Sequence, residues 1–141
     1  MNKIVFLVLL LVCSISFVQH TEARPLDIVG AATRKLFEIL GKATYYDVEA
    51  GVGSCGIQSS HSDHVVAVNH GQMENGPNPN KNPKCNQKVK INGPNGKNIE
   101  AEVVDTCPGC PNGCLDMSTS LFELVCGNLD LGVCSINWDF V

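Results

Sequence analysis

The cysteines constrain the fold of this chain more than any other feature of its sequence. Of the eight cysteines in 141 residues, Cys13 lies near the N-terminus and seven follow it: Cys55, Cys85, Cys107, Cys110, Cys114, Cys126 and Cys134. In a small secreted domain such a set indicates a disulfide framework. The odd number leaves one cysteine over, which is free, capped or paired with a second chain. We expect a monomer, with a disulfide-linked dimer as the alternative.

A zinc site is the competing interpretation of these cysteines. Cys107 and Cys110 have the spacing of half a zinc site, but zinc needs four nitrogen or sulfur ligands. The candidate histidines His61, His64 and His70 lie far upstream, without metal-binding spacing. We therefore expect disulfides, with no metal and no cofactor.

The N-terminus has the pattern of a secretory signal peptide. Asn2-Lys3 precedes an apolar run from Ile4 to Val12, and Thr21-Glu22-Ala23 offers small residues at the cleavage positions. This run is shorter than the roughly 20 apolar residues that cross a membrane. We expect residues 1–23 to be removed, and the protein to be secreted and extracellular with no membrane association.

The balance of charge does not suit a nucleic-acid partner. The chain carries a formal net charge of −4, whereas nucleic-acid-binding domains are typically basic. The charges are unevenly distributed, because five lysines lie between residues 81 and 97 and no Lys or Arg follows Lys97. We expect one basic and one acidic part of the surface.

The segment 24–42 differs from the rest of the chain. Its apolar residues recur at helical spacing: Leu26, Val29, Leu36, Phe37 and Leu40. Gly41 then suits the end of a helix. This pattern predicts a short amphipathic helix, as an N-terminal extension or a pro-segment.

From Ala43 to Val141 the patterns are those of one all-β domain. The expected strands are 43–48, 65–68, 89–91, 99–103 and 132–140, with a loop over 74–86 and a turn over 92–96. Ser120 and Glu123 form a capping-box pattern, which predicts a short helix that ends at Gly127. Together these elements predict a small β-barrel with one short helix.

Two carboxylates flank the cysteine-rich loop. Asp105 follows the apolar pair Val103-Val104, and Asp116 lies eleven residues later. Two positioned carboxylates suffice for acid/base chemistry on glycosidic bonds, and they also suit binding of sugar hydroxyls. Structural roles compete with both uses: Asp105 could accept backbone hydrogen bonds in the loop, and Asp116 or Ser118 could cap the helix.

These motifs, in this order, resemble a known family. They are Ala43-Thr44-Tyr45-Tyr46, Gly53-Ser54-Cys55-Gly56, Val65-Val66-Ala67-Val68-Asn69-His70, Val103 to Cys110, Leu115-Asp116-Met117-Ser118 and Ile136-Asn137-Trp138-Asp139-Phe140. The series is similar to the single-domain double-psi β-barrel proteins, namely expansin domain one, loosenin-like proteins and rare-lipoprotein-A-like domains, and it is related to family 45 cellulases. The resemblance covers about residues 43–141. It implies a six-stranded, disulfide-stapled double-psi β-barrel with an open groove that holds a polysaccharide chain.

The resemblance also implies roles for individual residues. Asp116 corresponds to the general acid of the related hydrolases, and Asp105 lines the same groove. Thr44 and Tyr46 match the Thr and the second aromatic residue of the family's first motif, and we expect them to bind substrate.

The general base of the cellulases has no clean counterpart. An ungapped match places Val48 at that position, and a shift of one residue places Asp47 there. Two further departures are Thr106, where the family usually has Arg, and the added cysteines Cys114 and Cys134. The added cysteines could form an extra staple with Cys126 or Cys107.

Three functions follow from these residues. We expect a protein that binds cell-wall polysaccharide (cellulose, chitin or peptidoglycan) and loosens it without hydrolysis. The alternatives are a glycoside hydrolase or lytic transglycosylase with Asp116 as acid and Asp105 or Asp47 as partner, and a small secreted effector or signalling protein. If the lysine-rich stretch 81–97 lines the groove, acidic polymers are favoured; otherwise neutral glucan or chitin is favoured.

Overall fold

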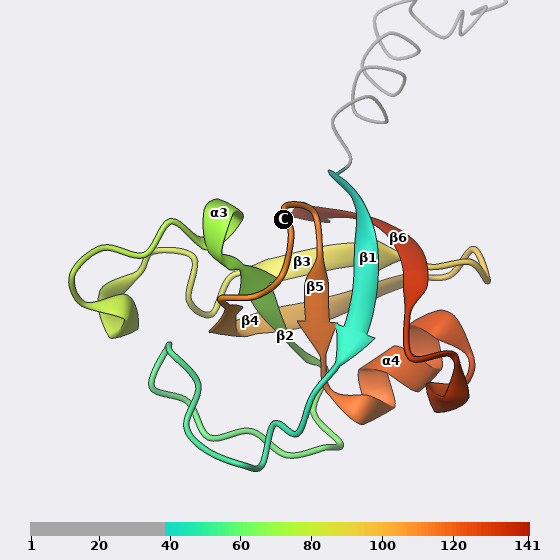
Figure 1. Ribbon diagram of the computed structural model, residues 1–141, viewed down its shortest axis with the longest axis horizontal. Helices are drawn as coiled ribbons and strands as arrows, with labels where there is room; N and C mark the ends of the chain where they lie inside the picture. Colours follow the sequence, from blue (N-terminus) through green and yellow to red (C-terminus); the bar gives the residue numbers. More distant parts are fainter. Residues whose placement is uncertain (1–38) are drawn as a thin grey trace, which may run out of the picture. The chain divides into compact units, whose positions relative to one another are not determined.

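Six strands form a closed barrel in the order β1-β5-β2-β4-β3-β6 (Figure 1). The computed structural model describes residues 39–141, so the expected signal peptide and residues 24–38 of the expected extension lie outside the described residues. The strands are β1 Ile39–Tyr45, β2 Val65–Asn69, β3 Lys88–Asn92, β4 Asn98–Cys107, β5 Leu115–Met117 and β6 Cys134–Phe140. The helices are α3 His70–Met73 and α4 Thr119–Cys126, with 3₁₀ turns η1 Pro79–Lys81 and η2 Leu129–Leu131. The predicted six-stranded barrel is confirmed.

The barrel interior is filled by the inward side of each strand. In β3, Val89 and Ile91 are fully buried while Lys88 and Lys90 are exposed, which is the alternation of a strand with one buried face. Trp138 of β6 is also fully buried, and its indole N–H donates a hydrogen bond of 2.8 Å to the carbonyl of Gly113. No helix within residues 39–141 is long and apolar enough to span a membrane.

The first strand begins earlier than the sequence pattern predicted. β1 pairs with β6 from Ile39, opposite Trp138, to Ala43, opposite Cys134. Leu40 therefore lies in a strand with its side chain 76% exposed, so the helical pattern does not extend over residues 39–42. Residues 39–42 therefore form part of the barrel wall.

The predicted helix near residue 120 is present, but its cap is not the one expected. α4 begins at Thr119 after Ser118, and the buried Ser118 hydroxyl donates to the carbonyl of Asp63 instead of capping the helix. The capping box at Ser120 is therefore wrong. The predicted end at Gly127 is confirmed, and its φ of 96° is a conformation that glycine adopts without strain.

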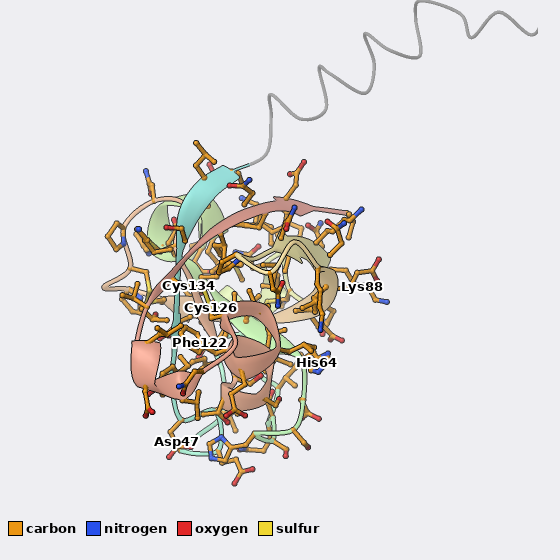
Figure 2. The ribbon with its side chains drawn as sticks, turned by 90° about the vertical axis from the view of Figure 1, so that its right-hand side faces the viewer. Asp47, His64, Lys88, Phe122, Cys126 and Cys134 are labelled. Atoms are coloured by element: carbon orange, nitrogen blue, oxygen red, sulfur yellow. A yellow bond between two sulfur atoms is a disulfide. The ribbon has the colours of Figure 1, made fainter. Side chains whose placement is uncertain are left out.

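Three disulfides staple the described residues: Cys55–Cys85, Cys107–Cys110 and Cys126–Cys134. Figure 2 shows Cys134 close to Cys126, the last residue of α4. Cys114 is the unpaired cysteine of the segment 39–141 and is half-buried. The expected framework with one cysteine left over is confirmed, and of the two added cysteines only Cys134 forms a staple.

Candidate functional site

Four residues on four adjacent strands form a row on the outer face of the barrel. Thr44 of β1 lies opposite Asp116 of β5, Asp116 lies opposite Ala67 of β2, and Ala67 lies opposite Asp105 of β4. Partners in a sheet share a face, so these side chains lie side by side. Thr44, Asp105 and Asp116 are half-buried, and the small Ala67 separates the two carboxylates. We call these four residues the acidic row.

A β-bulge turns Asp105 onto this face. The register of β2 with β4 shifts so that Val66 lies opposite Val103 while Ala67 lies opposite Asp105, which leaves Val104 without a partner. Simple alternation from the inward Val103 would direct Asp105 into the barrel. The extra residue re-aims the carboxylate outward, a use of bulges that recurs at functional sites.

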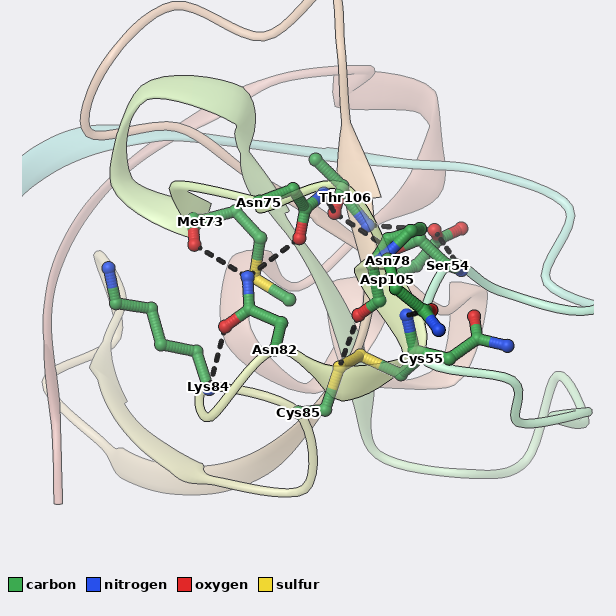
Figure 3. Close-up of a disulfide and its surroundings, with 12 residues drawn as sticks. Ser54, Cys55, Met73, Asn75, Asn78, Asn82, Lys84, Cys85, Asp105 and Thr106 are labelled. Atoms are coloured by element: carbon green, nitrogen blue, oxygen red, sulfur yellow. Dashed lines mark hydrogen bonds between the residues drawn. A yellow bond between two sulfur atoms is a disulfide. The ribbon is translucent and has the colours of Figure 1, made fainter.

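The Asp105 carboxylate is held by backbone amides. Its Oδ1 accepts hydrogen bonds of 2.7 Å from the backbone N–H of Ser54 and from that of Thr106. The Ser54 and Thr106 hydroxyls lie 2.8 Å apart, and Asn75 donates to Thr106, while Asn82 donates to Asn75 (Figure 3). Asp105 therefore accepts backbone hydrogen bonds, but from Ser54 and Thr106 and not from the Cys-Pro-Gly loop, and Thr106 links the loop around Ser54 to β4.

The Asp116 carboxyl group has a raised pKa. Burial is the main cause, and the negative charge of Asp105 adds to it, while a hydrogen bond of 2.6 Å from the Thr44 hydroxyl lowers the pKa in part. The sulfur atoms of Cys107 and Cys110 lie within 4.8 Å of the Asp116 carboxylate. They are joined in a disulfide, so they offer no thiolate to a metal ion. Asp116 keeps its proton to a higher pH than an ordinary aspartate.

Tyr46 lies beside both carboxylates, just beyond the end of β1. Its pKa is raised well above the ordinary value by burial, then by the negative charges of Asp105 and Asp116 and by hydrogen bonding to Asp105. The hydroxyl therefore remains a hydrogen-bond donor. Tyr45, by contrast, packs against Phe122 in a tilted arrangement, with ring centroids 4.9 Å apart. The structure thus brings together the predicted residues Thr44, Tyr46, Asp105 and Asp116.

Asp47 makes its contacts elsewhere. Its Oδ1 accepts a hydrogen bond of 3.1 Å from the backbone N–H of Glu49 and lies 3.3 Å from Nε2 of His61, and its side chain is 65% exposed. The charges that raise the pKa of Tyr46 come from Asp105 and Asp116. Sequence reasoning missed the contact with His61, because no motif connects two residues of the loop that follows β1.

Two residues of the lysine-rich stretch, Lys88 and Lys90, lie outside the acidic row. Lys88 and Lys90 lie on β3, which pairs with β4 and β6. Lys90 lies opposite Glu100 and Asp139, and the Lys88 ammonium is 3.6 Å from the Glu100 carboxylate. Acidic neighbours therefore offset these lysines.

An open hollow adjoins the row along β2 and β4. Its volume is about 310 Å³, and it is lined by Ile57, Gln58, Ser59, Asp63, His64, Val65, Glu102 and Val104. Val65 lies two residues before Ala67 and Val104 one residue before Asp105, so the hollow extends the same outer face. Its lining combines apolar side chains with hydrogen-bonding groups.

The raised pKa of Asp116 has a consequence for stability. A carboxyl group with a higher pKa in the folded than in the unfolded protein destabilises the fold once it ionises, and this cost disappears below the unfolded pKa. We expect Asp116→Asn to raise the free energy of unfolding at pH 7 by up to about 1 kcal/mol, since solvent screens a half-exposed group. Urea unfolding between pH 3 and 7 should show this gain vanishing toward low pH.

Asp47→Asn is the matched control, because it removes the charge of a mostly exposed carboxylate on the neighbouring loop. A variant Asp116→Asn that is less stable than the wild type at pH 7 would contradict the burial of this charge.

Comparison with known proteins places the fold in context. Neither models of protein families nor curated protein sequences match this chain. Among solved structures, the Streptomyces papain inhibitor is 36% identical with a TM-score of 0.66, and the match covers 74% of this chain and 94% of the inhibitor.

Two further solved structures share the fold. The Clavibacter michiganensis expansin, crystallised as an Asp-to-Asn mutant in complex with cellohexaose, is 26% identical with a TM-score of 0.61. The match covers 74% of this chain and 50% of the expansin, so this chain spans about half of that protein. Cerato-platanin 3 from M. perniciosa is 14% identical with a TM-score of 0.54 over 73% of this chain and 94% of its own, which shows the fold alone. The closed six-stranded barrel and the near-complete match to the inhibitor lead to one assignment: the chain belongs to the double-psi β-barrel family that includes the Streptomyces papain inhibitor.

Proposed function

We propose that this chain is a secreted protein whose acidic row binds a neutral cell-wall polysaccharide without cleaving it. The observation that carries the proposal is the row itself. It places a carboxyl group with a raised pKa, a hydroxyl and a second carboxylate on one outer face of the barrel. The expansin of similar fold that was crystallised with cellohexaose supports a β-linked glucan as the ligand class.

The chemistry of the row suits sugar hydroxyls. Asp105 and Asp116 offer acceptor oxygens, and Tyr46 adds a phenolic donor together with a ring face for stacking on a sugar. The row itself contains no Lys or Arg, and Lys88 and Lys90 lie outside it opposite acidic residues, so nothing in the row favours an acidic polymer. Cellulose and chitin are therefore better candidates than charged polymers.

The same contacts favour binding over hydrolysis. An inverting hydrolase needs a second carboxylate, roughly 6.5–9.5 Å from the acid, that is free to activate water. In this chain two backbone amides hold Asp105, and His61 lies beside Asp47. The pKa of Asp116 is raised, as a general acid requires, but neither Asp105 nor Asp47 is free to act as the base.

Binding assays test this proposal. We expect the wild type to sediment with cellulose or chitin without releasing soluble sugar. Asp116→Asn should bind about tenfold more weakly, because a hydrogen bond to a charged group contributes about 1.5–3 kcal/mol. Glu100→Gln removes one charge from β4 outside the row and should bind like the wild type. Sugar release that depends on Asp116 would overturn the non-hydrolytic function, and absence of binding to cellulose, chitin and peptidoglycan would overturn polysaccharide binding.

The similarity to the papain inhibitor supports a second candidate function, inhibition of a protease. At 36% identity over 94% of that inhibitor, the similarity is greater than to the expansin, which is 26% identical over 50% of its length. A titration of papain activity with the purified protein tests this function directly.

A further inference from the structure

Three exposed apolar side chains lie around the Cys126–Cys134 disulfide. Leu131 and Val133 are 54% and 50% exposed, and Leu124 on the preceding helix is 38% exposed. Single exposed apolar residues are common on protein surfaces. Here three lie within ten residues of the sequence, on and beside one covalently closed loop. We call residues 126–134 the closed loop.

The closed loop is held in one conformation. The disulfide joins residues that are 8 apart in the sequence, and the buried Cys134 begins β6. Within the loop, the Asn128 side chain accepts a hydrogen bond of 2.9 Å from the amide of Asp130, and the amide of Gly132 donates one of 2.9 Å to the carbonyl of Leu129. Leu129 also packs against the barrel core. A loop that is already ordered loses little conformational entropy on binding.

The closed loop is separate from the acidic row. β1 has β5 on one side and β6 on the other. The row runs from β1 through β5, β2 and β4, whereas the closed loop leads into β6 and lies beside α4 (Figure 1). Variants in the two places can therefore be read independently.

We propose that the closed loop is the inhibitory element of this chain, and that it places Leu131 and Val133 in the substrate cleft of a papain-type cysteine protease. This inference rests on the second proposed function. The charged side chains of this segment are acidic, since the exposed Glu123 precedes Cys126, the exposed Asp130 lies within the closed loop, and no Lys or Arg follows Lys97 in the sequence. The matching cleft is therefore apolar with a neutral or basic rim. Rigid apolar anchors surrounded by a polar rim are the usual source of affinity in such contacts.

Inhibition of papain by point variants tests this site. We expect Leu131→Asp to raise the inhibition constant for papain at least tenfold, because it places a charge where the cleft is apolar, and Val133→Ser to raise it by a smaller factor. Leu40→Asp is the matched control, since Leu40 is 76% exposed on β1 and lies outside the closed loop.

The outcomes separate the site from the function. If the wild type does not inhibit papain, both the second function and this site are wrong. If the wild type inhibits and both loop variants inhibit equally well, the function stands and the closed loop is not its site. Circular dichroism and retained binding to polysaccharide check that each variant is folded, and Val133→Ser, which introduces no charge, decides the question if Leu131→Asp does not fold.

Discussion

Replacing Gly41 with alanine is expected to destabilise the protein by about 2–6 kcal/mol. A Cβ atom at this position of β1 would lie 1.5 Å from the carbonyl oxygen of Gly113, a backbone atom that cannot rotate away. That oxygen accepts the indole hydrogen bond of the buried Trp138, so the chain cannot shift without breaking it. Overpacking costs about 1–3 kcal/mol and an unsatisfied buried donor about 1–3 kcal/mol more. Denaturant unfolding of the purified variant measures the loss.

Gly51→Ala is the matched control for this change. A Cβ atom at Gly51 has no neighbour within 4 Å, and the loop around it is exposed. We expect that variant to match the wild type, or to be more stable by up to about 1 kcal/mol through the unfolded chain. If Gly41→Ala and Gly51→Ala have equal stability, the close contact between β1 and the segment before β5 is wrong.

Sequence patterns predicted the strands that have a clear apolar pattern. The hairpin of β3 and β4 is clear because Val89 and Ile91 alternate with lysines, and β2 is clear because its apolar run is short and uninterrupted. The start of β1 was missed for the opposite reason. The Leu40 side chain is exposed to solvent, and its spacing from Leu36 and Phe37 in the sequence fits a helix. Strand pairing with β6, which is distant in the sequence, decides the conformation there.

The residues of the site could be predicted from the sequence, but their arrangement in space could not. The motifs named Thr44, Tyr46, Asp105 and Asp116, and the structure places all four together. The β-bulge at Val104 leaves no sequence signal, although it decides which way Asp105 points. The closed loop was missed as well, because the pairing of Cys126 with Cys134 was one of several alternatives.

Removing the Cys55–Cys85 disulfide is expected to lower the free energy of unfolding by about 3.6 kcal/mol, because the unfolded chain then regains the conformational entropy that the closed loop had removed. This disulfide closes a loop of sequence separation 30, whereas the separations are 8 for Cys126–Cys134 and 3 for Cys107–Cys110. The same relation gives about 2.5 kcal/mol and about 1.6 kcal/mol for these two. Paired replacement by alanine, followed by guanidinium unfolding at one pH, measures the three values.

Cys55–Cys85 should also differ from the other two in its effect on binding. Cys55 follows Ser54, whose amide donates to Asp105, and the Cys55 amide itself donates to the carbonyl of Val104 at 3.2 Å. Loss of this disulfide loosens the segment that orients Asp105, so binding to polysaccharide should weaken together with stability. Cys114→Ser is the control, because Cys114 has no disulfide to lose and should change neither quantity. Equal stability losses for all three disulfides would show that native packing, and not loop length, sets their contribution.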